Sequence, residues 1–203
     1  VLFIPYALAD HDAYVAEVTH ALAAFDIDVT GAPSPTDPVA ALRHAEVLFI
    51  GGGNTFRLLR ALQSLGLIEP IRAAVRAGTR YIGASAGTNV ACPSLRTTND
   101  MPIVQPRSFE ALSLLPFQIN PHYLDPDPHS THMGETREQR LLEYLEENEP
   151  PVLSLREGSW LRVSGNHATI GGPHPARLFE RHHEPKELPA GADVSYLLTR
   201  SSP

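Results

Sequence analysis

The feature that most constrains the fold of this chain is a series of short, unbroken apolar runs bounded by glycine or proline. Three of them, "VLFIP", "EVLFI" and "YIGAS", occupy residues 1–5, 46–50 and 81–85. Runs that are apolar at every position are typical of strands buried on both faces. Because helix-like segments separate the runs, the pattern predicts a mostly parallel sheet with helices on both faces.

The helix-like segments between these runs show helical spacing of apolar residues or helix start signals. In the first of them, four apolar residues fall on one helical face: Val15, Val18, Leu22 and Phe25. A weaker strand is expected at 26–32. The helices are expected at 12–25, 37–45, 55–65 and 70–77.

The second half of the chain has a different pattern. A buried strand is expected at 117–122 and an amphipathic helix at 136–148. Later short runs indicate successive antiparallel strands, so we expect one α/β domain over 1–203, with an antiparallel extension in its C-terminal half. Those runs are 151–155, 159–163 and 167–170, with a last strand at 194–198.

The net charge, the cysteine content and the lengths of the apolar runs limit which partners and which cellular location this protein is expected to have. The formal net charge of -7 argues against nucleic acid and anionic membranes as partners. The only cysteine is Cys92, and no apolar run approaches the ~20 residues that span a bilayer. A cytoplasmic protein without internal disulfides is therefore expected.

Ser85 lies at a corner that suits a nucleophile. Gly83-x-Ser85-x-Gly87 stands between a predicted strand and a helix, as in a nucleophile elbow. Small neighbours are needed because larger side chains would collide across so tight a bend. The helix start would then bring free N–H groups near a developing oxyanion. A plain glycine-rich connection is the alternative.

A triglycine, Gly51-Gly52-Gly53, follows the preceding strand. Glycines there would let backbone N–H groups approach a ligand and supply a second oxyanion donor. A dinucleotide fingerprint fails because position 56 is Phe, and no Gly-Lys-Ser/Thr follows for a phosphate loop. A turn without function is the remaining alternative.

A serine nucleophile needs a base, and His122 is the best candidate among ten histidines. It ends the predicted strand 117–122, so it should lie at the carboxyl edge of the sheet, where ligands and catalytic groups gather. His129 and His132 follow in a proline-rich loop, but their spacing from His122 matches no usual metal-ligand pattern. No metal or other cofactor is expected.

The base in turn needs an orienting carboxylate. Asp100, in "RTTNDMP", and Glu157, in "LREGSW", are both candidates, and each could equally be a solvated loop acid. Sequence alone leaves the choice between them open.

Together these residues resemble the peptidase E family of aspartyl dipeptidases. The similar segments occur in the family's order: "GGGNTFRLL", "YIGASAGTNVACP", "RTTNDMPIV", "QINPH", "GETREQR" and "REGSW". The resemblance implies a fold like that of class I glutamine amidotransferases. It also implies a serine peptidase that needs no metal and releases an N-terminal Asp from dipeptides.

The resemblance also implies roles for single residues. Ser85 would be the nucleophile and His122 its base. Glu157 would be the acid of a Ser-His-Glu triad, with Asp100 close to the site. Gly53 and Ala86 match the residues whose backbone N–H groups form the family's oxyanion hole. Arg137 matches the basic residue that would bind the carboxylate of the substrate's aspartate side chain.

Two further expectations accompany the resemblance. Family members have a strand and a helix ahead of the segment similar to "VLFIPYA", so we expect 1–203 to lack them. Alternative functions are a cyanophycinase-like hydrolase of aspartyl polymers, an α/β-hydrolase esterase and a non-catalytic binding module of the same fold.

Overall fold

The computed structural model describes residues 1–32, 37–129, 131 and 133–199. The chain forms two compact units, Val1–Leu114 and Leu115–Pro203. The single domain expected over 1–203 stays a prediction.

The first unit contains a four-stranded parallel sheet in the order β2-β1-β3-β4. The continuous apolar runs form its strands, as the sequence predicts. The weaker strand expected at 26–32 is reduced to two residues. The strands are β1 (Leu2–Ile4), β2 (Thr30–Gly31), β3 (Val47–Ile50) and β4 (Arg80–Gly83).

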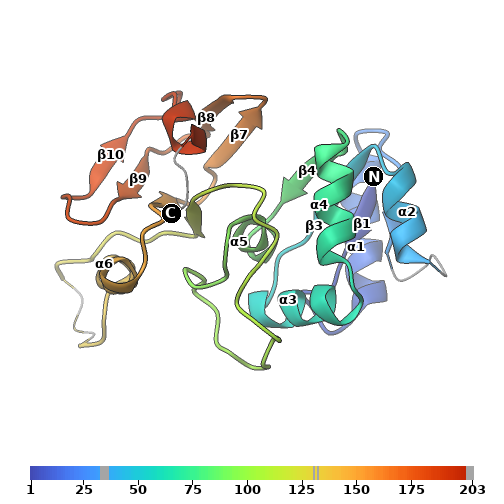
Figure 1. Cartoon of the computed structure of the whole chain (residues 1–203), viewed down its shortest axis with the longest axis horizontal. Coiled ribbons are helices and arrows are strands. Elements are labelled where there is room, and N and C mark those ends of the chain that lie inside the picture. Colours follow the sequence, from blue (N-terminus) through green and yellow to red (C-terminus); the bar gives the residue numbers. More distant parts are fainter. Residues whose placement is uncertain (33–36, 130, 132, 200–203) are drawn as a thin grey trace. The chain divides into compact units, whose positions relative to one another are not determined.

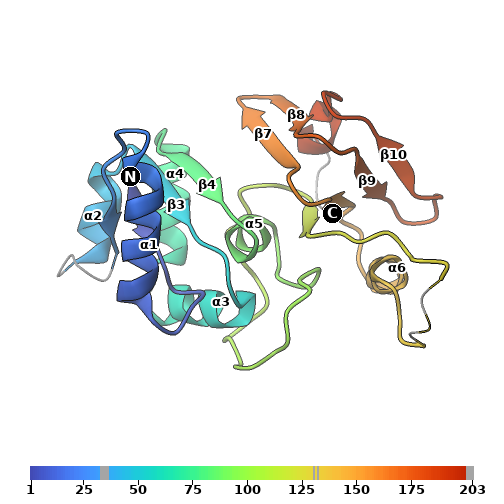
Figure 2. The same ribbon diagram turned by 180° about the vertical axis from the view of Figure 1, so that it is seen from behind.

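Helices cover both faces of this sheet. Helices α2 and α4 lie side by side at the front in Figure 1, and α1 is at the front in Figure 2, where the unit is seen from behind. The predicted α/β class is therefore confirmed. The helices are α1 (His11–Ala23), α2 (Pro38–His44), α3 (Thr55–Ser64), α4 (Ile68–Arg76) and α5 (Ala86–Ala91).

Local sequence signals explain where most of these helices begin. The Asp37 side chain accepts the first free N–H groups of α2, and Pro38 occupies the first turn, where it needs no N–H partner. Asn54 caps α3 in the same way. Helix α1 ends at Ala23, so the expectation that Phe25 belongs to its apolar face is wrong, and Phe25 is 72% exposed.

The core of the first unit lies between the sheet and its helices. Both strands and helices contribute side chains to it, the helices more of them, and each buried aliphatic side chain contributes about 1.5–3 kcal/mol. Its fully buried members include Leu48, Ile50, Leu58, Leu59, Leu62, Ile71 and Val90.

The second unit contains a mixed sheet in the order β10-β9-β6-β5 and a separate hairpin of β7 and β8. Strands β5 and β6 are parallel, and β9 and β10 add antiparallel neighbours. The strands are β5 (Gln118–Pro121), β6 (Val152–Leu155), β7 (Trp160–Ser164), β8 (His167–Gly171), β9 (Ala176–Phe179) and β10 (Lys186–Leu188).

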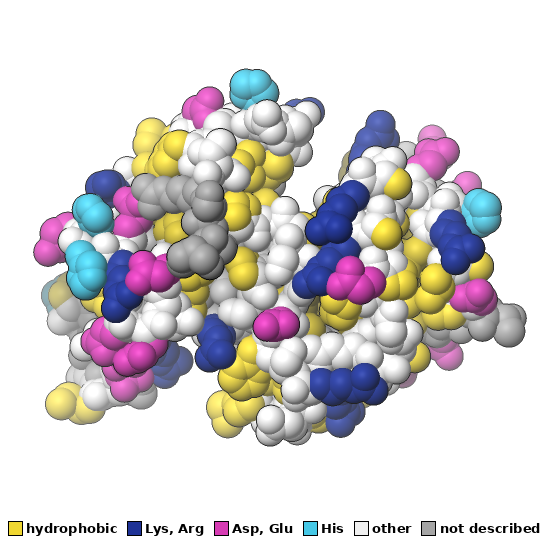
Figure 3. All heavy atoms as spheres, viewed as in Figure 1, with side chains coloured by type: hydrophobic (Ala, Val, Ile, Leu, Met, Phe, Trp, Pro, Cys, Tyr) yellow, Lys and Arg dark blue, Asp and Glu magenta, His cyan; other side chains and the backbone are white. Residues whose placement is uncertain are grey.

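Helix α6 (Arg137–Glu147) is the α-helix of this unit's described residues. Leu141 and Leu145 pack against Tyr123 and Phe179, while acidic side chains gather over the helix on the face seen in Figure 3. The expected amphipathic helix at 136–148 is thus confirmed.

Two expectations for the second unit are wrong. Residues 194–198 form no strand, because Ser195–Thr199 is a 3-10 helix whose first N–H donates to the Asp193 carboxylate. The run at 151–155 does not pair with the next one along the chain; β6 pairs with β5 and β9 instead. Only β7 and β8 form the expected antiparallel neighbours.

Among the described residues, no helix combines the length and the apolar character that crossing a bilayer requires.

Candidate active site

Ser85 stands at a sharp bend between β4 and α5 in the first unit. Its backbone angles are φ 51° and ψ -104°, a conformation that residues other than glycine rarely adopt. The residue is half-buried. This is the geometry that the elbow pattern predicts.

The glycines on either side of Ser85 are required by close packing. A Cβ added at Gly83 would lie 2.6 Å from the Gly87 carbonyl oxygen. One added at Gly87 would lie 2.1 Å from the carbonyl oxygen of Ile50 on β3. The bend is also held by the buried Tyr81 hydroxyl, which donates to the Gly87 carbonyl at 2.6 Å. Burial raises the pKa of Tyr81 well above its ordinary value, so it stays a donor.

The triglycine lies against the same corner, since a Cβ at Gly52 would be 3.2 Å from that of Ser85. Two of its three N–H groups are engaged: Gly51 donates to Ile4 at 3.1 Å and Gly52 to the Tyr14 hydroxyl at 2.9 Å. No acceptor for the N–H of Gly53 is found among the described residues.

Gly53 and Ala86 therefore offer two N–H groups in this unit without an acceptor in the described part of the chain. Gly53 has φ 128°, and a Cβ there would lie 2.7 Å from the Ala7 carbonyl oxygen, so only glycine fits. Ala86 is the first residue of α5, where N–H groups have no partner within the helix.

Asp100 is engaged at the start of α3. Its Oδ2 accepts hydrogen bonds from the Thr55 N–H at 2.7 Å and from the Thr55 hydroxyl at 2.6 Å. Thr55 is fully buried, and its hydroxyl is 3.5 Å from the side-chain nitrogen of Asn89 on α5. Asp100 thus braces the helix that follows the triglycine.

His122 and Glu157 form a close pair in the second unit. His122 Nδ1 lies 2.6 Å from Glu157 Oε2, and the side chains are 49% and 79% exposed. The parallel register explains the pairing, because Pro121 is opposite Leu155, and His122 and Glu157 follow the ends of these two strands. His122 has φ 55°, so the chain turns sharply there.

Arg137 is the first residue of α6. Thr136 and Gln139 form a capping box around it, which fixes the helix start. The Arg137 side chain is half-buried. Two acids close to it in sequence form ion pairs: Glu135 contacts Arg140 at 3.6 Å and Glu138 contacts Arg177 at 3.0 Å.

The described residues contain no group of three or more histidine, cysteine or acidic side chains placed to hold a metal ion. His129 is described, and its N–H donates to Asp127. His132 lies outside the described residues.

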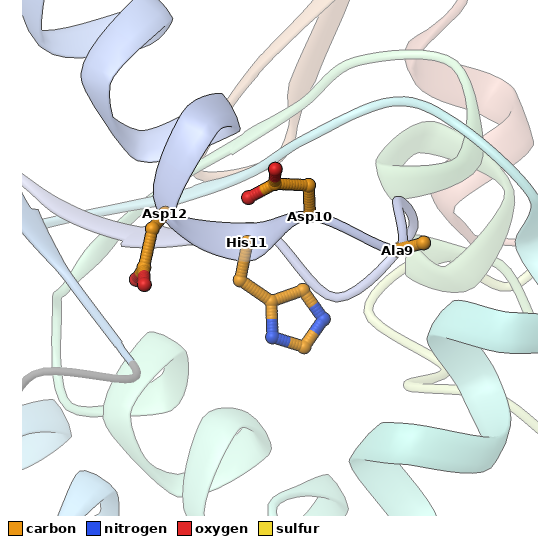
Figure 4. Close-up of a pocket in the computed structure, with 4 residues that line it drawn as sticks. All are labelled: Ala9, Asp10, His11 and Asp12. Carbon is orange, nitrogen blue, oxygen red and sulfur yellow. The ribbon is translucent and has the colours of Figure 1, made fainter.

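An open depression of about 580 Å³ lies at the start of α1, just after β1. It is lined by Ala9, Asp10, His11 and Asp12, and Figure 4 shows the Asp10 carboxylate and the His11 ring pointing in opposite directions in that view. Asp10 is occupied as the cap of α1, since it accepts the Ala13 N–H at 3.0 Å. The depression is at the carboxyl end of a parallel strand, the edge that also carries Gly53 and Ser85.

Comparison with known proteins gives these residues a family. Residues 1–171 match the sequence model described as Peptidase family S51. This chain belongs to peptidase family S51. It is a serine peptidase, and the resemblance seen in its motifs is confirmed.

Relatives of this S51 peptidase cover nearly all of it. It is 64% identical over 196 residues to Peptidase E of Streptomyces coelicolor, and this alignment covers 97% of this chain and 81% of the relative. It is 51% identical over 201 residues to the probable alpha-aspartyl dipeptidase of Drosophila melanogaster, covering 98% and 84%.

Solved structures support the fold of the S51 peptidase. The crystal structure of a peptidase from an acI-B1 Actinobacterium aligns with a TM-score of 0.70 at 16% identity, covering 95% of this chain and 82% of that one. A putative Peptidase E protein from Listeria monocytogenes aligns with a TM-score of 0.67 at 24% identity and 85% coverage of both.

Sequence reasoning missed two residues that bond to or adjoin the candidate site residues, one in each unit. The Tyr14 hydroxyl accepts a hydrogen bond from the Gly52 N–H. In the sequence Tyr14 is only an aromatic residue within a predicted helix, and nothing there indicates this contact. Arg156, next to Glu157, is bound by two carboxylates. An arginine directly beside a candidate acid was the available signal.

Proposed function

We propose that this S51 peptidase hydrolyses Asp-Xaa dipeptides through an acyl-enzyme on Ser85, with His122 as base and Glu157 as the acid that orients it. The observation that carries the mechanism is the 2.6 Å contact between His122 Nδ1 and Glu157 Oε2. The substrate is supported by the name of the Drosophila relative, a probable alpha-aspartyl dipeptidase, at 51% identity.

In this mechanism the Ser85 hydroxyl oxygen attacks the scissile carbonyl carbon while its proton passes to His122 Nε2. Glu157 accepts the Nδ1–H and so keeps the correct tautomer. His122 then gives the proton to the leaving amine, which departs as the second amino acid. A water molecule attacks the acyl-enzyme by the same proton route and releases aspartate.

The N–H groups of Gly53 and Ala86 are the proposed oxyanion donors. Both lie in the first unit, and neither has an acceptor within the described ranges. The engagement of the Gly51 and Gly52 N–H groups leaves Gly53 as the glycine able to serve. Each such donor contributes about 3–4 kcal/mol to the transition state in other acyl-transfer sites.

Glu157 is preferred to Asp100 because of their partners. The Glu157 carboxylate contacts the His122 imidazole, whereas Asp100 accepts two hydrogen bonds from Thr55 at 2.7 and 2.6 Å. We therefore assign Asp100 a supporting role at the start of α3.

Arg137 is the proposed ligand of the substrate's aspartate side chain. Burying a carboxylate without a partner would be prohibitive, and a guanidinium can meet it with two parallel hydrogen bonds. The half-buried position at the start of α6 suits this role, because N–H groups at a helix start also favour an anion.

The alternatives explain less of what is observed. A cyanophycinase-like hydrolase would use a similar serine elbow, but no relative considered above has that name. An esterase triad of Ser85, Asp100 and His122 would take the acid that Thr55 already engages. A non-catalytic binding module would not need the His122–Glu157 pair.

One substrate panel tests the proposal. Purified protein is mixed with Asp-Leu, Ala-Leu, an aspartyl polymer and a short ester, with and without EDTA, and the same is done with Ser85→Ala. We expect cleavage of Asp-Leu alone, unaffected by EDTA and lost in the variant, which should unfold at a similar temperature. Full activity of Ser85→Ala, or zinc-dependent recovery after EDTA, would contradict the mechanism.

A further inference from the structure

Arg156 is the most heavily bonded side chain of the second unit's described residues that the mechanism does not use. Its Nε and Nη2 donate to the two oxygens of Asp125 at 2.8 and 2.7 Å. Its Nη1 and Nη2 donate to Glu187 at 3.0 and 2.9 Å, and Nη1 also donates to the Pro175 carbonyl at 2.7 Å. All five N–H groups of the guanidinium are therefore used.

The positions of these partners connect the network to the proposed acid–base pair. Arg156 comes directly before Glu157, at the end of β6, and Asp125 is three residues after His122, at the end of β5. The two-bond contact between Arg156 and Asp125 thus joins the loop that carries the base to the loop that carries the acid. The backbone adds one more link, the Tyr123 N–H donating to the Leu155 carbonyl at 3.0 Å.

The network continues to the start of α6. Arg177 contacts Glu187 at 3.1 Å and Glu138 at 3.0 Å, and Glu138 accepts from the Tyr123 hydroxyl at 3.0 Å. Tyr123 follows His122 and Glu138 follows Arg137 in the sequence. Each proposed functional residue of the second unit therefore has a direct sequence neighbour in one charged network.

Such support is needed because the acid–base pair itself is exposed. Glu157 is 79% exposed, and a single contact between exposed polar side chains contributes only ~0–1 kcal/mol, too little to fix its own geometry. The Arg156 side chain is only 16% exposed, and its guanidinium lies 5.6 Å from the centre of the Tyr123 ring. Arg156 is thus the better-buried and more fully bonded group, and the exposed pair is attached to its network through the backbone.

We propose that the Arg156–Asp125 pair is a positioning device that holds Glu157 and His122 in register for catalysis. Arg156 touches neither the imidazole nor the substrate in this role, and acts through the two loops. The inference rests on the proposed function of His122 and Glu157. A misplacement of about 1 Å at a catalytic group can lower a rate by about 100-fold, so the loss of this clamp should affect turnover more than binding.

The decisive variant is Arg156→Lys, because lysine keeps the charge but cannot make two parallel bonds to Asp125. Arg181→Lys is the matched control: Arg181 also pairs with a glutamate, Glu149, and donates to a carbonyl, that of Glu146, but adjoins no proposed functional residue. We expect kcat on Asp-Leu to fall by about 10- to 100-fold in Arg156→Lys with KM within about twofold, and Arg181→Lys to match the wild type.

A second readout needs no substrate. In protein labelled with ¹⁵N-histidine, the two ring nitrogens of His122 report its tautomer, and the signals are assigned by their loss in His122→Ala. Wild type and Arg181→Lys should show the proton held at Nδ1 at neutral imidazole, and Arg156→Lys a mixture of tautomers. Asp125→Asn, which is nearly isosteric, should give the same mixture if Arg156→Lys does not fold.

These outcomes separate the two proposals. If the wild type does not cleave Asp-Leu, the proposed substrate is wrong. The tautomer of His122 would still test whether the Arg156–Asp125 pair positions His122 and Glu157. Wild-type kcat and a single tautomer in Arg156→Lys and Asp125→Asn would overturn the clamp. An equal loss of kcat in Arg181→Lys would also overturn it, because the effect would then be general destabilisation.

Discussion

The two candidate acids of the triad are separated by a pair of near-isosteric substitutions, Glu157→Gln and Asp100→Asn. Glu157→Gln replaces the carboxylate that lies 2.6 Å from His122 Nδ1 with an amide that no longer selects one tautomer. The equivalent change in another serine protease triad lowers kcat by about 10⁴-fold, which corresponds to about 5 kcal/mol of transition-state stabilisation. We expect a loss of that order here.

Stability should change in the opposite order. The His122–Glu157 pair is largely exposed, so its loss should cost at most about 1 kcal/mol, or about 2–4 °C in Tm for a chain of this size. Asp100→Asn keeps an acceptor oxygen but replaces two charge-assisted hydrogen bonds from the buried Thr55 with neutral ones, which costs about 1–1.5 kcal/mol per bond. That variant should lose about 4–12 °C in Tm while keeping kcat within about tenfold.

The assay is kcat on Asp-Leu at saturating substrate, measured well below each variant's Tm, together with thermal unfolding followed by circular dichroism. Glu157→Gln should be nearly inactive and almost as stable as the wild type, and Asp100→Asn active but less stable. An inactive Asp100→Asn with an unchanged Tm, beside a Glu157→Gln of near-normal activity, would refute the reasoning and reverse the assignment.

Three further expectations concern specificity, packing and acid stability. Arg137→Lys should lower kcat/KM for Asp-Leu by at least about tenfold, or ~1.4 kcal/mol, and that for Asn-Leu much less; equal small losses would make Arg137 a surface residue. Gly87→Ala should fail to form a stable fold in expression and melting assays, because its Cβ would lie 2.1 Å from the Ile50 carbonyl oxygen; a wild-type Tm would contradict this. The pKa values of Asp125 and Glu187 are lowered, chiefly by hydrogen bonds from the arginine they share, so their contribution to stability is present above their ordinary values of 3.8 and 4.5 and is lost as pH falls below them. Urea unfolding from pH 7 to 3 should therefore show a steeper acid loss in the wild type than in Asp125→Asn, and parallel curves would count against it.

The first unit was predictable because its information is local. Continuous apolar runs gave its strands, and Asp37 and Asn54 capped the helices that follow. The bend at Ser85 also follows from neighbouring glycines, which pack against backbone atoms close by. What local sequence did not reveal was Tyr14, whose hydroxyl reaches a glycine 38 residues away.

The second unit was harder because its pairing is not local. Strand β6 pairs with β5, which precedes it, and with β9, which comes after the β7–β8 hairpin. Adjacency in sequence predicted pairing with β7 instead, which is wrong. The apolar run at 194–198 is too short for its periodicity to distinguish a strand from a helical turn. The Asp193 carboxylate accepts the Ser195 N–H and so favours the 3-10 helix. Which acid meets His122 depends on the register between β5 and β6, which no motif encodes.

The backbone of Ser85 sets activity against stability at a single residue. A non-glycine residue held at φ 51° and ψ -104° carries about 1–3 kcal/mol of conformational strain, which the packing around the bend must offset. Glycine would relax that strain and would also remove the hydroxyl. Selection for stability alone would therefore favour loss of the proposed nucleophile, so an effort to make this peptidase more heat-resistant should leave position 85 unchanged.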